Sequence, residues 1–257
     1  MTRIERFRDA YWTWFLQPRS RGGFASRRVL TSLFEHAWKT GTPSDQCQVL
    51  DFFARTCDPR GEAIVHAGLR HRRASIRGNA LVAALFWARK HALTRPIIAQ
   101  LKRIATRSTG ENQRYMALEA LTEAGAVDAA WLIRIARQDS SAEVRQLAYE
   151  QTLPAGSKEA KRVLLADVRK HPDSFGVAQE IWQHRSAVGL TEREESFLRG
   201  VIDRYVEWLE CQAGDADGNH ATRNMARDML ARFAQDGFAV HRRDGRVSRG
   251  AAPRASA

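Results

Sequence analysis

The chain has 257 residues, of which 44% are hydrophobic and 27% are charged. This composition is typical of a folded globular protein of one or two domains, and it excludes a collagen, a coiled coil and a wholly disordered chain. The 41 basic residues outnumber the 29 acidic residues and give a formal net charge of +12, which favours anionic partners such as nucleic acids through long-range attraction.

Apolar residues recur at helical spacing along nearly the whole chain, and no segment alternates with period two for long enough to predict a strand. We therefore expect an all-α protein. The first predicted helix places one aromatic-rich face inward, with Ile4, Phe7, Tyr11, Trp14 and Phe15. Trp12 points away from that face, so we expect it at a second packed surface, which is a partner contact, a dimer contact or a crossing helix.

Two further helices follow before residue 60. The second is predicted to pack Leu33, Phe34 and Trp38. The third begins with Thr42 as its N-cap, followed by a proline at the first helical position and an aspartate in the first turn. This arrangement satisfies backbone amides that have no partner inside the helix.

From residue 62 the predicted helices come in pairs. The first helices of the pairs span 62–70, 95–107, 127–138 and 158–170, and the second helices span 74–91, 111–124, 141–153 and 174–185. Three second helices share a register in which alanine follows arginine by three positions. The arginines are Arg77, Arg114 and Arg145, which stand 37 and 31 residues apart. Repeats of this period indicate a solenoid.

The register resembles HEAT repeats, especially the short bacterial repeats of phycobilisome-lyase-type proteins, whose second helix often reads apolar-Arg-x-x-Ala after an aspartate in the turn. Asp139 stands in that place before Arg145. The resemblance covers about residues 60–185. It departs at the turn "RHRRAS", which has no aspartate, at Gln113, which replaces an apolar residue, and at "SFGVAQEIWQ", which lacks the arginine.

The resemblance implies a right-handed α-solenoid of about four to six antiparallel helix pairs, and an armadillo-like or other α-solenoid stays open as an alternative. It also implies that Arg77, Arg114 and Arg145 tie each turn to the next layer, a structural role that we favour over a ladder of phosphate contacts.

The C-terminal region is predicted to close the repeats. Thr191 and Glu194 form a capping box before a long helix, and a last helix packs Met225 and Phe233. We expect a helical cap or divergent repeats at 1–59, helix-pair repeats at 60–189, capping helices at 190–237 and a flexible basic tail at 238–257.

The sequence contains no pattern that predicts catalysis, a cofactor or a metal. Asp215, Asp217 and Asn219 alternate like the start of a calcium loop, but the glycine falls at the wrong position, so we expect a solvated loop. The three cysteines lack metal-binding spacing and do not suggest a disulfide framework. With no predicted membrane span or signal peptide, we expect a cytoplasmic protein that does not bind a membrane.

Basic residues gather around the turn between the first predicted helix pair and on the adjoining helices. The candidates for contact with an anion or a nucleic acid are Arg70, Arg72, Arg73, Arg77, Arg89, Lys90, Lys102, Arg103 and Arg107. If they face one way, they form an electrostatic track. If they are scattered, they only solubilise a surface.

Three functions follow from these patterns. The first is a non-catalytic scaffold or adaptor whose extended surface holds a protein partner. The second is a protein that binds DNA or RNA through a basic face and the arginine-rich tail. The third is an enzyme, or a lyase-like chaperone of a bound chromophore, for which the sequence offers no catalytic residue.

Overall fold

The computed structural model describes residues 1–16, 27–214, 220–235 and 238. Every regular element in these ranges is a helix, which confirms the predicted all-α class. The chain divides into two compact units, Met1–Gln151 and Thr152–Ala257, which we call unit 1 and unit 2. The division falls inside the segment 60–189 that the sequence predicts as repeats.

Unit 1 begins with three helices, α1 (Arg3–Leu16), α2 (Arg27–Thr40) and α3 (Pro43–Thr56), followed by the short 3₁₀ turn η1 (Pro59–Gly61). An aromatic cluster holds the three helices together, because the Phe34 ring meets Phe7 edge to face at 5.0 Å and Phe52 at 4.1 Å. The predicted start of α3 is confirmed, since Thr42 and Asp45 form a capping box.

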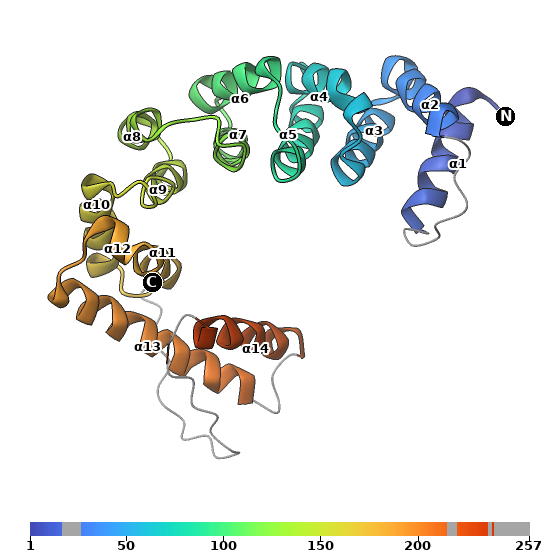
Figure 1. The fold of residues 1–257 in the computed structure, drawn as a ribbon. Coiled ribbons are helices and arrows are strands. Elements are labelled where there is room, and N and C mark those ends of the chain that lie inside the picture. Colours follow the sequence, from blue (N-terminus) through green and yellow to red (C-terminus); the bar gives the residue numbers. More distant parts are fainter. Residues whose placement is uncertain (17–26, 215–219, 236–237, 239–257) are drawn as a thin grey trace. The chain divides into compact units, whose positions relative to one another are not determined.

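Three helix pairs complete unit 1. They are α4 (Glu62–Leu69) with α5 (Ala74–Ala88), α6 (Arg95–Arg107) with α7 (Glu111–Glu123), and α8 (Ala129–Gln138) with α9 (Ala142–Glu150). The first helices α4, α6 and α8 form one row, and the second helices α5, α7 and α9 form another (Figure 1). Helix α3 packs beside α5 and extends the second row.

The repeated alanines lie at the contacts between helices, as the shared register predicts. Ala80, Ala117 and Ala148 have no exposed surface. Glycine has the same role in α4, since a Cβ atom added at Gly68 would lie 2.8 Å from the Cβ of Ala80. Small side chains therefore let α4 and α5 approach closely.

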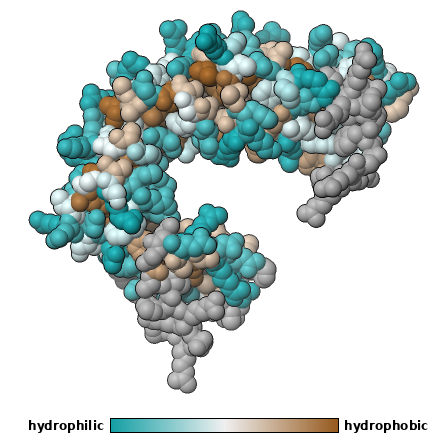
Figure 2. Space-filling model, viewed as in Figure 1, coloured by the Kyte–Doolittle hydropathy of each residue, from teal (hydrophilic) through white to brown (hydrophobic). Residues whose placement is uncertain are grey.

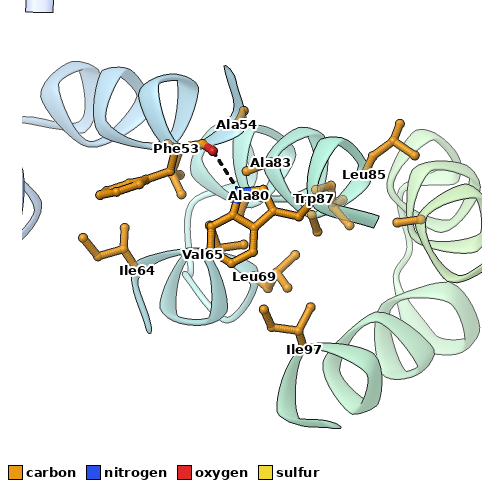
Figure 3. Packing of buried hydrophobic residues seen from close by; sticks show 14 of the residues in the cluster. Phe53, Ala54, Ile64, Val65, Leu69, Ala80, Ala83, Leu85, Trp87 and Ile97 are labelled. Atoms are coloured by element: carbon orange, nitrogen blue, oxygen red, sulfur yellow. Dashed lines mark hydrogen bonds between the residues drawn. The ribbon is translucent and has the colours of Figure 1, made fainter. Parts of the chain in front are cut away.

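A tryptophan fills the space between the layers of unit 1. Figure 3 shows the Trp87 indole of α5 among Val65, Leu69 and Ile97, side chains that come from α4 and α6. The indole nitrogen donates a 2.8 Å hydrogen bond to the carbonyl of Phe53 in α3. Trp87 thus joins α3 to α5 while its ring fills the core, which satisfies the polar atom of a buried indole.

The surface of unit 1 combines hydrophobic and hydrophilic regions. Figure 2 shows hydrophobic residues surfacing in an interrupted band along the helix layers, with hydrophilic residues on both rims.

Unit 2 contains α10 (Lys158–Lys170), α11 (Phe175–Gln183), the short α12 (Arg185–Val188), α13 (Glu192–Gly214) and α14 (His220–Gln235). Helix α11 packs against α10 and α13, and α13 packs along α14. The predicted capping box at the start of α13 is confirmed, since the Glu194 carboxylate accepts from the Thr191 backbone amide at 2.9 Å and the Thr191 hydroxyl accepts from the Glu194 amide at 3.3 Å.

Two details at the C-terminal end differ from the sequence prediction. Met225, expected to pack inside, is 51% exposed. Phe238, the first residue of the predicted tail, is buried, with its ring centroid 5.4 Å from that of Trp182 and 5.7 Å from that of Phe233. The rest of that tail, 239–257, lies outside the described residues.

Candidate interaction surfaces

The three repeat arginines clamp the turns that precede their helices. In Arg77, Arg114 and Arg145, the Nη1 atom donates to the carbonyls five and six positions earlier in the chain, over distances of 2.8 to 3.3 Å. The acceptors are His71 and Arg72, Ser108 and Thr109, and Asp139 and Ser140. Equivalent residues thus make equivalent bonds in three successive pairs.

Arg114 also reaches across to the next turn. Its Nε and Nη2 atoms each donate to the Asp139 carboxylate at 2.8 Å, and the side chains of both residues are at least nine-tenths buried. Burial raises the pKa of Asp139, but the hydrogen bonds from Arg114 and from the Ser141 amide outweigh it, so the pKa lies below its ordinary value. Asp139, the turn aspartate that resembles the one in HEAT repeats, is therefore one partner of a buried ion pair.

Arg77 makes a weaker link of the same kind. Its Nε atom donates to the Oε1 atom of Gln113 at 3.4 Å, so an amide takes the place that Asp139 occupies beside Arg114. The Arg77 guanidinium is thereby bonded to three oxygen atoms of the protein. This geometry fits the structural role that the resemblance implies.

The other predicted basic residues come from several elements of unit 1. Arg70, Arg72 and Arg73 are exposed at the turn between α4 and α5. Arg89 and Lys90 follow the far end of α5, about 18 Å from Arg77 at 1.5 Å per residue. Three more lie on or at the end of α6, namely Lys102, Arg103 and Arg107. The nine candidates therefore come from three segments of the chain, and whether they form one continuous track stays a prediction.

Arg89 is held by acidic residues of the neighbouring pair. Its guanidinium donates to Glu119 at 3.0 Å and to Glu123 at 3.1 Å, both on α7. Because Arg77 near the start of α5 meets the start of α7, and Arg89 at its end meets the end of α7, the two helices run parallel.

The structure adds three basic residues that the sequence reading missed. Helices α6 and α8 together carry six basic residues and no acidic residue. We call them the basic row: Arg95, Lys102, Arg103, Arg107, Arg134 and Arg137. The signal in the sequence is the absence of acidic residues from 95–107 and 129–138, which stays hidden when only clusters of arginine are sought.

An open hollow of about 520 Å³ lies between α6 and α8 on this side of unit 1. Lys102, Trp131 and Arg134 line it together with the residues that connect α7 to α8. Asp128 also lines it, but its carboxylate caps α8 by accepting from the Trp131 amide at 2.7 Å. The hollow thus holds two cations and one carboxylate already engaged in a helix cap.

The row α5, α7 and α9 presents a surface of opposite charge, which we call the acidic face. It consists of Val82 and Phe86 on α5, Glu111, Tyr115, Met116, Glu119 and Glu123 on α7, and Glu143 and Glu150 on α9. These positions recur at helical spacing, and all of them are at least partly exposed. Sequence reasoning missed this surface.

Electrostatic contacts show that these residues share one surface. Burial is the main cause that raises the pKa of Tyr115, and the charges of Glu119 and Glu150 add to it, so the phenol of α7 lies near carboxylates of both α7 and α9. The neighbouring Glu111 side chain is the main cause that lowers the pKa of Glu143, which agrees with the packing of α7 against α9.

A smaller aromatic surface lies on α1. Trp12 is 48% exposed, so it does point away from the packed face of the helix, and its role as a partner contact stays a prediction. Phe15, expected on the packed face, is 39% exposed, with the Arg55 guanidinium 5.3 Å from its ring centroid. The aromatic stripe of α1 is thus wider than one neighbouring helix covers.

The described residues contain no group of three or more histidine, cysteine, aspartate or glutamate side chains that could hold a metal ion. The calcium-like positions Asp215, Asp217 and Asn219 lie outside the described part of the chain. In the same described ranges, no helix combines the length and the apolar character that crossing a membrane requires.

No protein-family model, curated protein or solved structure matches the chain. The surfaces of unit 1 therefore carry the functional inference.

Proposed function

We propose that the chain is a non-catalytic HEAT-like repeat protein that serves as a protein-interaction scaffold or adaptor and holds its partner on the acidic face. In this proposal the helix pairs belong to a right-handed α-solenoid of about four to six pairs. The equivalent arginine clamps in three successive pairs support it, because they are expected if the pairs repeat one structural unit.

The exposure of apolar side chains on the acidic face carries the proposal. Phe86 is 40% exposed, and Val82, Tyr115 and Met116 are only partly buried. Apolar groups gathered on the surface of a soluble protein mark contacts with other molecules. The surrounding glutamates repel phosphate groups, so this face favours a protein over a nucleic acid.

Site-specific photo-crosslinking in the native host tests the proposal. The photoreactive residue p-benzoylphenylalanine replaces Phe86 in the full chain, and a control carries it at Thr106, which is exposed on α6. We expect protein adducts from position 86 and none from position 106. Protein adducts from position 106 alone, or adducts from position 86 that nuclease removes, would contradict the proposal.

The basic row favours a second candidate function, the binding of nucleic acid. Six cations without an acidic residue on α6 and α8, together with the three exposed arginines of the α4–α5 turn, are suited to phosphate contacts. This surface lies on the opposite row from the acidic face, so the two functions do not compete for the same residues.

Fluorescence anisotropy with labelled single-stranded DNA, duplex DNA and RNA across a salt series tests this second candidate. We expect binding that persists near physiological salt and weakens in the variant Lys102→Gln/Arg134→Gln. Weak binding that disappears alike for all three polymers would show that the net charge is incidental.

A further inference from the structure

We infer that the acidic face recognises a basic segment of its protein partner, in which arginine or lysine side chains flank an apolar residue. This inference rests on the proposed function, because it names the class of partner for the same face. Three observations lead to it: the sign of the charge, the placement of glutamates at matching positions of neighbouring helices, and the apolar side chains among them.

The charge of the acidic face is opposite to that of the chain. Its five glutamates are accompanied by Arg89, which bonds to two of them, and by Arg145 on α9, so negative charge is in excess on a chain whose formal net charge is +12. Packed helix rows are about 8–10 Å apart, and at 0.1 M salt charges are screened over about 10 Å. A bound segment that touches the glutamates therefore interacts more strongly with them than with the basic row behind them.

Two of the glutamates lie at the starts of neighbouring helices. Glu111 is the first residue of α7 and Glu143 lies in the first turn of α9, and both are exposed on two helices that pack against each other. Arg145 is the basic residue nearest to Glu143 in the sequence. Its Nη1 atom is bonded to two turn carbonyls. A cationic side chain from a partner would bridge the two carboxylates with charge-assisted hydrogen bonds and remove their repulsion.

A second pair of glutamates lies about two turns further along the same two helices. Glu119 and Glu150 flank Tyr115. Two acidic positions on the same pair of helices suit successive basic side chains of one segment. The apolar side chains Val82, Phe86 and Met116 are partly exposed on α7 and on the neighbouring α5, and methionine and aromatic rings adapt well to an apolar residue of a partner.

Binding of peptide probes to the purified full chain tests the inference. One labelled peptide combines lysine and arginine with leucine, and a second of equal length replaces every basic residue by glutamate. We expect anisotropy to report binding of the basic peptide and a Kd at least tenfold weaker for the acidic peptide. Salt should weaken the binding of the basic peptide.

Two matched variants locate the site. Glu143→Gln/Glu150→Gln should weaken binding of the basic peptide about tenfold, since tenfold in Kd corresponds to about 1.4 kcal/mol and two charge-assisted contacts are lost. Asp203→Asn/Glu207→Gln changes the charge equally on exposed positions of α13 in unit 2 and should leave the Kd unchanged. Circular dichroism confirms that both variants are folded.

A third variant tests the apolar part. Phe86→Ser should weaken binding of the leucine-containing basic peptide and leave the binding of a peptide with serine in place of leucine unchanged. Equal affinity for the basic and acidic peptides, or an equal loss in both glutamate variants, would overturn the inference. The inference would also be overturned if Glu143→Gln/Glu150→Gln weakened the binding of single-stranded DNA, because the acidic face would then bind nucleic acid.

The outcomes separate this inference from the proposed function. If position 86 crosslinks to a protein but the basic peptide shows no preference, the scaffold function stands and the basic partner is wrong. If position 86 yields no protein adduct, the scaffold function fails at this face, whatever the peptides show.

Discussion

At the scale of single residues, the arginine clamps explain how the turns of unit 1 are satisfied. Carbonyls in the turn that follows a helix have no partner inside that helix, and one guanidinium in the first turn of the next helix binds two of them. The three clamps differ beyond this shared contact. Arg114 adds a buried bond to a carboxylate, whereas Arg77 adds a bond to an amide.

Arg114→Met tests how much the buried ion pair with Asp139 contributes to the free energy of unfolding. Removing one partner leaves the Asp139 charge buried without its counter-ion, so we expect a loss of about 3–5 kcal/mol in the free energy of unfolding. Arg77→Met removes hydrogen bonds to neutral oxygen atoms only and leaves no buried charge, so we expect a smaller loss of about 1.5–3 kcal/mol. Urea denaturation measures both. The double variant Arg114→Met/Asp139→Asn should recover part of the loss, and losses that simply add would contradict a coupled pair.

Asp45 couples the stability of unit 1 to pH. Its carboxylate is 2% exposed and accepts from Arg8 at 2.7 and 2.9 Å and from the Thr42 amide at 2.8 Å. The hydrogen bond from Arg8 is the main cause that lowers the pKa of Asp45 to about 2, against the opposing effect of burial.

Asp45→Asn should therefore destabilise the protein at neutral pH only. Because the pKa is lower in the folded state than the unfolded value of about 3.9, the stabilisation is present above about pH 4 and is lost as the pH falls toward 2. We expect the variant to be about 2 kcal/mol less stable than the parent at pH 7 and nearly equal to it at pH 2. Urea denaturation at both pH values measures the difference, and a difference that persists at pH 2 would contradict the assignment.

At the scale of helices, close packing of the pairs depends on where small residues lie. Gly68 of α4 faces Ala80 of α5, and an added Cβ atom would also lie 3.2 Å from Leu50. Gly78 of α5 faces open space, since no atom lies within 4 Å of an added Cβ atom. The two glycines occupy neighbouring helices but opposite environments.

The same substitution should therefore have opposite effects at the two glycines. Gly68→Ala forces α4 and α5 apart and should destabilise the protein by about 1–3 kcal/mol. Gly78→Ala restricts the unfolded chain without a clash and should stabilise it by about 0.5–1 kcal/mol. Thermal unfolding followed by circular dichroism measures both changes. Destabilisation by both substitutions would contradict the packing described between α4 and α5.

The helices themselves could be predicted from the sequence, because periodicity and capping are local. The predicted pairs between residues 62 and 185 agree with α4 to α11 within two residues at each end, except that α5 and α9 end three residues earlier than predicted. The acidic face could not be predicted in this way. Its glutamates look like ordinary solvated positions until α5, α7 and α9 are aligned, and that alignment depends on contacts such as Arg89 with Glu119, 30 residues apart.

The wide aromatic stripe of α1 shows another limit of local patterns. Trp12 and Phe15 both belong to a broad apolar arc, and only the position of the neighbouring helices decides which ring is covered. The structure leaves both rings partly exposed. Hydrophobicity alone therefore predicts that the helix is packed, but not the angle at which it is packed.

At the scale of the whole molecule, net charge is a poor guide to where charge acts. The formal charge of +12 includes arginines bound to turn carbonyls and Arg89 paired with two glutamates. Unit 1 carries excess negative charge on one row of helices and only positive charge on α6 and α8. A partner therefore meets a surface whose sign depends on the row that it approaches.

The two compact units should also respond separately to a change in the core. Leu81 is fully buried in the core of unit 1, and Leu81→Ala should cost about 2–5 kcal/mol. Hydrogen exchange followed by mass spectrometry should show faster exchange in peptides from α3 to α9 and unchanged exchange in peptides from α10 to α13. A uniform increase along the chain would show that the units unfold as one.

The arginine clamp has a consequence for how such a chain can grow. Each clamp joins an arginine to carbonyls only five and six positions earlier, so its donor and its acceptors lie within one short stretch of sequence. An in-frame duplication of one helix pair would therefore copy both the arginine and the turn carbonyls that it binds. The link from Arg114 to Asp139 would be preserved only if the copied pair is followed by a turn with an aspartate at that position. The chain can thus be lengthened by whole helix pairs without a new turn, provided that each added pair packs against the pairs on either side of it.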